Sequence, residues 1–406
     1  MCLGEKETMN TKTIDDVDLR EKRVLVRVDF NVPMDSKGNI TDDKRILESL
    51  PTIRKILNTR GIPIIMSHLG RPKGRPSKEF SLKPLAGHLS TLLSKDVQFA
   101  PDCVGKETKE VVDALKPGSV LLLENLRFHP EEEKNNPEFA KQLASYGDVY
   151  VNDAFGTAHR AHASTEGVTK FLRPAVAGYL MKKEIEYLAK AVTNPQRPYV
   201  AILGGAKISG KIDVIQNLLP KVDVLVIGGG MAFTFFRAQE LEIGDSLVEQ
   251  DKVQLAKQIL DEIKASNRRV ILPIDCVVAD KFDNNAMRKT VPVNKIKPGW
   301  RGLDIGPQTI QLISLELKNA KTIVWNGPMG AFEMSNFANG TMEVAKLLAE
   351  ATKNGATTIV GGGDSAAAIT QMGFEASISH VSTGGGASLE YLEGKQLPGL
   401  VALDTK

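Results

Sequence analysis

The chain has 406 residues, with 52 Lys plus Arg against 49 Asp plus Glu, which leaves a formal net charge of +3. Hydrophobic residues make up 42% and charged residues 25%, ordinary globular values that exclude a disordered, collagen-like or coiled-coil chain. The balanced charge argues against a dedicated nucleic-acid-binding protein, which usually has a large basic surplus. At about 150 residues per domain, the length predicts two or three domains.

The first residues and the cysteines predict a soluble protein of the reducing cytoplasm, and we expect it to be a monomer. Residues 1–10 contain no apolar signal segment, no later apolar run has membrane-spanning length, and Met9 is an alternative start. Cys2, Cys103 and Cys276 are far apart and form no C-x-x-C pair, so we expect neither a disulfide framework nor a zinc site.

Short, nearly continuous apolar runs recur along the chain, each followed by a glycine-rich or polar turn. Such runs are typical of parallel strands that are covered on both faces. The expected strands are residues 24–28, 63–66, 120–123, 149–151, 199–203, 222–227, 269–272, 322–325, 357–360 and 377–381. Amphipathic segments lie between them, as at 251–266 and 341–352. The alternation predicts an α/β protein with two doubly wound parallel-sheet domains.

A charged helical stretch over 181–193 is the best candidate for a boundary, because Asn194-Pro195 ends it. It divides the chain into an N-terminal domain at 10–180 and a C-terminal domain at 194–390. The stretch is either a helical hinge between the domains or an ordinary surface helix within one of them.

The second half is rich in glycine, because residues 1–180 hold only 12 of the 35 glycines. Five clusters follow expected strands there, and glycine lets backbone N–H groups approach a phosphate closely. We therefore expect a nucleotide or phosphorylated ligand. These clusters are Gly204-Gly205-Ala206-Lys207, Gly228-Gly229-Gly230, Asn326-Gly327-Pro328-Met329-Gly330, Gly361-Gly362-Gly363-Asp364 and Gly384-Gly385-Gly386.

Two known phosphate-binding fingerprints almost fit, and neither holds. Gly205 to Lys211 matches G-x-x-x-x-G-K, but Ile212 stands where a magnesium-binding Ser or Thr is needed. Gly361 to Ala366 matches a dinucleotide motif, but no acidic residue follows about 20 positions later to bind a ribose.

The first half holds five of the six histidines, and the loops after its expected strands carry arginine together with histidine. Guanidinium groups suit carboxylates and phosphates, so this pattern predicts a small anionic substrate. His159 and His162 are spaced like a metal pair, but no third ligand stands nearby in the sequence. The acidic run Glu131-Glu132-Glu133 is interpreted as the solvated start of a helix.

Five segments together resemble the phosphoglycerate kinase family, in order along the chain from about residue 12 to the C-terminus. They are residues 27–33 (Arg-Val-Asp-Phe-Asn-Val-Pro), 67–72 (Ser-His-Leu-Gly-Arg-Pro), 204–207 (Gly-Gly-Ala-Lys), 325–328 (Trp-Asn-Gly-Pro) and 361–364 (Gly-Gly-Gly-Asp). The resemblance implies reversible phosphoryl transfer from 1,3-bisphosphoglycerate to ADP, giving 3-phosphoglycerate and ATP. It also implies that the domains close about the hinge and that the tail, 391–406, packs back on the N-terminal domain.

The resemblance implies site residues by position. The expected glycerate-binding set is Asp29, Asn31, Arg45, His68, Leu69, Gly70, Arg71, Arg127 and Arg160. The expected nucleotide-binding set is Gly205, Lys207, Lys211, Gly229, Asn326, Glu333, Gly362, Gly363, Asp364 and Ser365.

Three of these residues are expected to stabilise the transferring group: Arg45 from one domain, and Lys207 and Lys211 from the other. Asp364 is expected to hold Mg²⁺ on the nucleotide phosphates and also to cap the helix that follows it. Glu333 is expected to bind the ribose. The alternative from another functional class is a non-catalytic nucleotide-binding relative.

Overall fold

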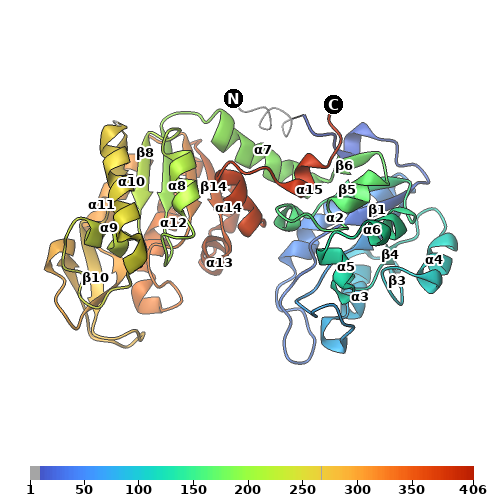
Figure 1. Ribbon diagram of the computed structural model, residues 1–406, viewed down its shortest axis with the longest axis horizontal. Coiled ribbons are helices and arrows are strands. Elements are labelled where there is room, and N and C mark those ends of the chain that lie inside the picture. The colour runs from blue at the N-terminus through green and yellow to red at the C-terminus, as the bar shows by residue number, and fades with distance from the viewer. Residues whose placement is uncertain (1–9, 267) are drawn as a thin grey trace. The chain divides into compact units, whose positions relative to one another are not determined.

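The computed structural model describes residues 10–266 and 268–406, so the alternative start at Met9 lies outside the described residues. The chain folds into two compact units, one made of residues up to Glu186 together with Gln396–Lys406, the other of Tyr187–Lys395 (Figure 1). Helix α7 (Tyr179–Thr193) contains the point where the first unit passes into the second. None of the described helices is long and apolar enough to cross a membrane.

The first unit is built on a six-stranded parallel sheet in the order β3-β4-β2-β1-β5-β6. Its strands are β1 (Arg23–Arg27), β2 (Ile62–Met66), β3 (Gln98–Phe99), β4 (Leu121–Leu122), β5 (Val149–Asn152) and β6 (Ala175–Ala177). Every residue of β2 and β5 is buried, as expected for strands covered on both faces. The edge strands β3 and β6 were not predicted, because Gln98–Phe99 starts with a polar residue and Ala175–Ala177 is mostly alanine, so neither forms a recognisable apolar run.

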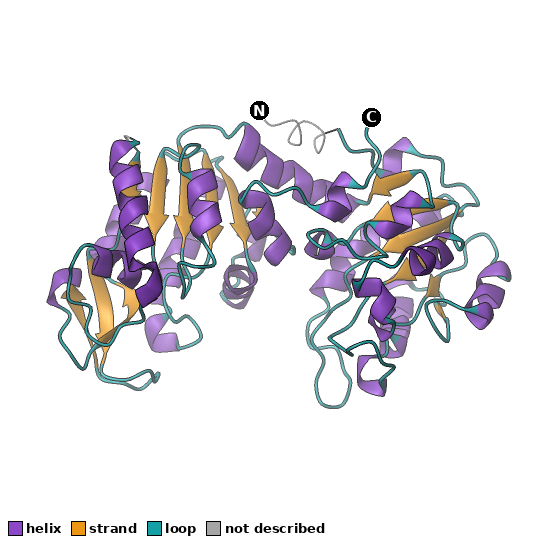
Figure 2. Cartoon of the chain, in the orientation of Figure 1, coloured by secondary structure: helices purple, strands orange, loops and turns teal. Residues whose placement is uncertain are grey.

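Helices cover both faces of this sheet (Figure 2). They are α2 (Lys44–Asn58), α3 (Lys83–Leu93), α4 (Lys106–Asp113), α5 (Pro130–Glu133), α6 (Pro137–Ala144) and α15 (Pro398–Val401). Helix α2 shows the helical period, because Ile46, Ile53 and Ile56 lie on one face and are fully buried in the core of the unit.

The last residues of the chain belong to this first unit. The backbone N–H of Asp404 donates to the carbonyl of Ala175 at 2.8 Å, and the side chain of Asn152 donates to the carbonyl of Gly399 at 3.0 Å. Strands β5 and β6 therefore hold the C-terminal segment through both backbone and side-chain hydrogen bonds.

The second unit is built on another six-stranded parallel sheet, in the order β15-β14-β13-β7-β8-β9. Its strands are β7 (Tyr199–Leu203), β8 (Val224–Ile227), β9 (Arg269–Ile271), β13 (Thr322–Asn326), β14 (Thr357–Gly361) and β15 (His380–Val381). All six were predicted, although β15 is shorter than expected because a 3₁₀ turn, Glu375–Ser377, occupies the first part of the predicted run.

Two groups of helices cover the faces of this sheet (Figures 1 and 2). One group is α8 (Ile212–Leu218), α9 (Ala232–Ala238), α10 (Val253–Ala265) and α14 (Gly386–Leu392). The other is α11 (Pro307–Leu317), α12 (Asn339–Lys353) and α13 (Gly363–Gln371). The helices expected at 251–266 and 341–352 correspond to α10 and α12, and the fold class is confirmed.

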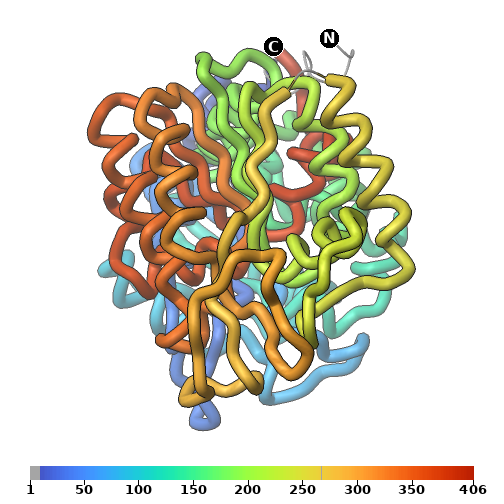
Figure 3. Tube along the Cα trace, turned by 90° about the vertical axis from the view of Figure 1, so that its left-hand side faces the viewer, coloured from blue at the N-terminus to red at the C-terminus, as the bar shows by residue number. Residues whose placement is uncertain are grey.

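A second, antiparallel sheet in this unit was missed by the sequence analysis. It has the order β11-β10-β12 and consists of β10 (Asp275–Ala279), β11 (Arg288–Pro292) and β12 (Arg301–Ile305). Figure 3 follows the chain through this segment in yellow and orange. Four of the five residues of β11 are exposed, so this strand has no apolar run by which it could have been found.

The strand order of each unit identifies where a ligand should bind. Parallel α/β sheets bind ligands at the carboxyl ends of neighbouring strands whose connections run in opposite directions. In the first unit this point lies between β1 and β5, and in the second between β7 and β13. The register places Arg27 beside Asn152 and Leu203 beside Asn326, so the loops that follow these residues start side by side.

Candidate functional site

A hydrogen-bonded network joins the loops that follow β1 and β2 in the first unit. Asp29 accepts from Nη1 of Arg45 at 2.8 Å, and the same nitrogen lies 3.3 Å from the carbonyl of Asn31. The Asn31 side chain accepts from the N–H of Gly70 at 2.9 Å, and Nη1 of Arg127 donates to the carbonyl of Gly70 at 2.9 Å. Five of the expected glycerate-binding residues therefore lie in one connected group.

A second, buried layer supports this network and was not predicted as a group. Arg27 is fully buried at the end of β1; its Nε donates to the hydroxyl of Ser164 at 2.9 Å, and Nη2 lies 3.1 Å from Nδ1 of His68. Ser164 donates in turn to Glu132 at 2.6 Å. The sequence signal was the polar residue at the end of an apolar run, Arg27, which by itself also fits a solvated strand end.

Glu132 corrects the interpretation of the acidic run as solvated. The acidic run lies in a short helix, α5, as expected, but the side chain of Glu132 is fully buried and accepts from both the N–H and the hydroxyl of Ser164. Burial raises the pKa of this carboxyl, against the charge of Arg27. Glu132 is the third residue of α5, and Ser164 links it to Arg27. Spacing along the sequence could not reveal this contact.

The histidines of this site are held in the neutral form. Burial lowers the pKa of His68 well below its usual value, and the charges of Arg27 and Arg127 lower it further. Burial and Arg27 likewise lower the pKa of His162 to about 3. His68 can therefore donate or accept a hydrogen bond without carrying charge, and the positive field of the pocket comes from its arginines.

The remaining expected glycerate-binding residues differ in exposure. Arg71 is exposed in the loop after β2, and Arg160 is half-buried with its Nε 3.1 Å from Nε2 of His159. The side chain of Leu69 is buried in the hydrophobic core, so its carbonyl, which accepts from Asn125 at 2.8 Å, is what it presents to the loops. Leu69 can thus contribute only backbone to a ligand.

Several glycines of the second unit are needed because the loops after β7, β8 and β13 pack closely against one another. Gly229 has φ +66°, and a Cβ there would lie 2.6 Å from both N and O of Gly205. The N–H of Gly205 donates to the carbonyl of Pro328 at 2.8 Å. Part of the glycine enrichment therefore reflects this loop packing, which places Gly205 and Gly229 at the mouth of a cavity.

Lys211 and Asn326 form a polar pair near these glycine loops. Nζ of Lys211 donates to Oδ1 of Asn326, while Nδ2 of Asn326 is buried without a hydrogen-bond partner. Burial lowers the pKa of Lys211 to about 8, although the charges of Asp364 and Glu393 oppose the shift. A partly buried ammonium beside an unsatisfied amide N–H is a site prepared for an anion.

These two residues line a cavity of about 180 Å³ together with the start of helix α13. Gly362 has φ +90° and is the N-cap of this helix, so Asp364 lies in its first turn and the expectation that Asp364 is the N-cap is wrong. The Ser365 hydroxyl accepts from the N–H of Gly327 at 2.6 Å and thereby joins α13 to the loop after β13.

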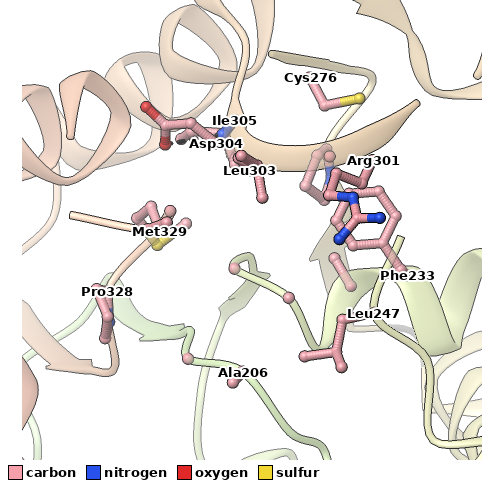
Figure 4. Close-up of a pocket in the computed structure, with 18 of the residues that line it drawn as sticks. Ala206, Phe233, Leu247, Cys276, Arg301, Leu303, Asp304, Ile305, Pro328 and Met329 are labelled. Carbon is pink, nitrogen blue, oxygen red and sulfur yellow. Dashed lines mark hydrogen bonds between the residues drawn. The ribbon is translucent and has the colours of Figure 1, made fainter. Parts of the chain in front are cut away.

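A larger, mainly apolar cavity of about 480 Å³ adjoins the glycine loops (Figure 4). Phe233, Leu247, Leu303 and Met329 line it, and Leu303 belongs to the antiparallel sheet that the sequence analysis missed. Its wall also includes four expected nucleotide-binding residues: Gly205, Gly229, Glu333 and Asp364. The cavity suits a flat, apolar group such as a nucleobase, and Asp364 borders both this cavity and the polar one.

The residues at this junction fit a magnesium–nucleotide complex. Asp364 offers an exposed carboxylate, the ligand type that Mg²⁺ prefers, and lines the same cavity as Asn326, whose Nδ2 is buried without a hydrogen-bond partner. Lys207 is exposed in the loop after β7, where its ammonium is free to reach a ligand. Among the described residues, His159 and His162 have no third group placed to complete a metal site.

Comparison with known proteins agrees with this geometry. The family model described as phosphoglycerate kinase matches residues 14–395. Proteins named phosphoglycerate kinase from Chloroherpeton thalassium and Chlorobaculum tepidum are 62% and 59% identical, over 97% and 98% of this chain and 99% and 100% of their own.

Solved structures agree as well. The phosphoglycerate kinase of Coxiella burnetii has a TM-score of 0.88 at 42% identity, and that of Pyrococcus horikoshii 0.82 at 34%, each covering 97% of this chain and 98% of its own. The chain therefore belongs to the phosphoglycerate kinase family.

Proposed function

We propose that the chain catalyses reversible transfer of a phosphoryl group from 1,3-bisphosphoglycerate to MgADP, giving 3-phosphoglycerate and MgATP. The observation that carries the proposal is that one chain holds two different anion-binding arrangements, each at the ligand-binding point of its own parallel sheet. One is a group of arginines and the other a lysine–amide pair beside an apolar cavity.

The arginine group supports a glycerate that carries a phosphate and a carboxyl or acyl phosphate. Arg45 and Arg127 are oriented by Asp29 and Gly70, so their guanidinium groups need little rearrangement to bind oxygens. Asn31 and His68 add neutral hydrogen-bonding groups at the same loops. Arg71 and Arg160 extend the positive surface at the ends of β2 and β5.

In the second unit, the apolar cavity and the smaller polar cavity share Asp364 in their walls, an arrangement that suits the base at one end of a nucleotide and the phosphates at the other. The base would enter the apolar cavity, Glu333 would bind ribose hydroxyls, and the phosphates would meet Lys211, Asn326 and the first N–H groups of α13. Asp364 would hold Mg²⁺, which when bound neutralises charge on the nucleotide phosphates. Gly363 and Ser365 would contribute backbone N–H groups.

Transfer then needs alignment and charge stabilisation, without a covalent intermediate on the protein. Phosphoryl transfer spreads negative charge over three equatorial oxygens, and Arg45, Lys207 and Lys211 would stabilise them. The acyl phosphate needs no general base when it is the donor. His68 and His162 are neutral near pH 7, because burial lowers the pKa of each, so neither would act there as an imidazolium acid.

We also propose that the units act as a glycerate domain (10–180, with the last residues of the tail) and a nucleotide domain (from 194). The tail was expected to start at residue 391, but residues 391–395 belong to the second unit and only Gln396–Lys406 to the first. Residues 181–193 would be the hinge about which they close on bound substrates. Closure would exclude water, which otherwise competes for the acyl phosphate.

The alternative of a non-catalytic relative gains no support, because the matching relatives bear the name of an enzyme. Its expected signature, loss of Arg45, Lys207 or Asp364, is also missing from this sequence. We further propose that the protein is cytoplasmic, since Cys103 and Cys276 are both free thiols, as in a reducing compartment. We also propose that it is a monomer.

A coupled assay of ATP consumption that depends on 3-phosphoglycerate tests the proposal. We expect activity that needs Mg²⁺ and that falls on Lys207→Ala or Asp364→Asn. Lys257→Ala, at an exposed lysine of α10, is the matched control and should leave turnover unchanged. Equal loss in the control, or ATP consumption without the glycerate, would contradict the assignment.

A further inference from the structure

Three potential metal ligands converge in the first unit, outside the anion-binding network. Asp102 and Cys103 lie between β3 and α4, and His129 follows the 3₁₀ turn Leu126–Phe128. A carboxylate oxygen, the sulfur and an imidazole nitrogen from these residues all lie within 4.8 Å of one another. In residues 10–266 and 268–406, no other group of His, Cys, Asp or Glu meets this spacing.

The local fold fixes the three ligand atoms. Nε2 of His129 lies 2.7 Å from Oδ1 of Asp102, and the N–H of Cys103 donates to the same oxygen at 2.6 Å. The carbonyl of Asp102 accepts from the Thr108 hydroxyl at 3.0 Å, and the His129 ring packs against Phe139 with centroids 5.4 Å apart. The cluster is therefore ordered through α4 and α6 as well as through its own contacts.

The chemistry of the set suits a borderline-soft divalent cation such as Zn²⁺. Zinc binds thiolate at about 2.3 Å, imidazole at about 2.0–2.1 Å and carboxylate at about 2.0–2.2 Å. Two anionic ligands, Asp102 and thiolate Cys103, balance the charge of the ion, so the buried complex would be neutral. On binding, the cation replaces the thiol proton, which leaves to solvent.

The exposure of the three residues provides a path for the ion. Cys103 is fully buried, whereas the side chains of Asp102 and His129 are 43% and 28% exposed. An ion can therefore enter from solvent and keep a water as its fourth ligand. We propose that Asp102, Cys103 and His129 form a binding site for one Zn²⁺-like cation with an open fourth position.

The sequence analysis missed this site, because it considered only sites built from several cysteines or from the closely spaced histidines His159 and His162. A site of the first kind needs paired cysteines, whereas this one combines a single cysteine with a neighbouring aspartate and a histidine 26 positions later. Strand β3, which precedes Asp102 and Cys103, pairs with β4, which precedes the 3₁₀ turn before His129, so the fold brings the two segments together.

Cobalt(II) titration of the full-length chain, stripped of metal with a chelator, tests the proposal. We expect one equivalent of Co²⁺ to produce a near-ultraviolet thiolate-to-metal charge-transfer band, which Zn²⁺ removes and excess Mg²⁺ does not. Binding at Asp364 through oxygen ligands alone would give no such band, and Cys276, which lines the same cavity as Asp364, is tested separately by a variant. Absence of the band from the folded wild-type chain would overturn the proposal and leave an Asp102–His129 ion pair only.

Variants assign the ligands. Cys103→Ser should lose the band, and Cys276→Ser, at the other buried free thiol, should keep it. If Cys103→Ser does not fold, His129→Gln serves instead. Loss of an outer hydrogen-bond partner commonly weakens metal binding 10–100-fold, so loss of the His129 ligand should weaken Co²⁺ binding by at least about 100-fold. A band unchanged in Cys103→Ser, or unchanged affinity in His129→Gln, would show that the ion binds elsewhere.

Discussion

Nη1 of Arg45 donates a hydrogen bond to Oδ2 of Asp29 at 2.8 Å, and this contact joins the loop after β1 to the first turn of α2. The Asp29 side chain is 10% exposed and that of Arg45 36% exposed, so the carboxylate orients the guanidinium at the surface of the pocket. An arginine held in this way is prepared for a charge that develops beside it. This pair supports the proposed role of Arg45, which the sequence alone places at an ordinary helix start.

Arg45→Ala should mainly lower kcat, by about 100-fold or more, because the proposed contact is to the transferring group. The KM for 3-phosphoglycerate should change less, since the other arginines remain. Steady-state kinetics measure both. Arg54→Ala, at an exposed arginine on the same helix, is the matched control. Unchanged kcat with only a raised KM would assign Arg45 to ground-state binding.

Lys211 should make nucleotide affinity depend on pH. Its pKa of about 8 means that it is charged at pH 7 and increasingly neutral above pH 8. Bound phosphates favour the charged form, so the Kd for ADP should rise with pH above 8, by up to about tenfold per unit. Calorimetric titrations between pH 7 and 9.5 measure this. Lys211→Arg should bind with little dependence on pH, because guanidinium stays charged; identical pH profiles for both proteins would refute the role.

Asp153 should make the first unit less stable as pH rises. This carboxyl is fully buried under the start of α7, where it accepts from the N–H of Met181 at 3.1 Å. Burial raises its pKa from 3.8 to about 7. Between these values the folded chain binds more protons than the unfolded chain, so the free energy of unfolding should fall with pH by roughly 1 kcal/mol per unit.

Denaturant unfolding of wild type and Asp153→Asn from pH 4.5 to 7.5 tests this. The difference in stability between the two proteins should change with pH over that window and level off above it, since the amide of the variant does not titrate. Asp304→Asn provides a parallel case in the second unit, because burial also raises the pKa of Asp304 to about 7. A constant difference across the window would contradict the assignment to Asp153.

Binding of both substrates should compact the molecule if residues 181–193 act as a hinge. Small-angle X-ray scattering of the free protein, each binary complex and the ternary complex measures the radius of gyration. We expect the largest decrease in the ternary complex. Unchanged dimensions in that state would argue against closure about this helix.

The parallel sheets were the most predictable part of the fold, since strands such as β7 and β13 are buried on every residue. That burial forces a continuous apolar run, which is visible without knowledge of neighbours. Strand β11 has the opposite property: hydrogen bonds to β10 define it, while its side chains face solvent. Its sequence therefore resembles a polar loop, and the wall of the apolar cavity built by β12 was missed with it.

The candidate site also has a part that could be predicted from the sequence and a part that could not. Strand ends that carry arginine, or glycine with lysine, were visible because parallel topology brings such ends together. What the sequence concealed were contacts between distant segments: Glu132 with Ser164 beneath Arg27, and Gly362 taking the capping position that was assigned to Asp364. Local pattern identifies the residue type at such positions, but only the folded chain decides which group it meets.

Forward transfer is the most direct test of the central claim, that this chain moves the acyl phosphate of 1,3-bisphosphoglycerate to MgADP. The purified chain should be mixed with both substrates, and ATP, 3-phosphoglycerate and free phosphate measured over time. We predict one ATP and one 3-phosphoglycerate for each bisphosphoglycerate consumed, with no enzyme-dependent release of phosphate. No ATP from a correctly folded protein, or phosphate release in place of ATP, would contradict the account.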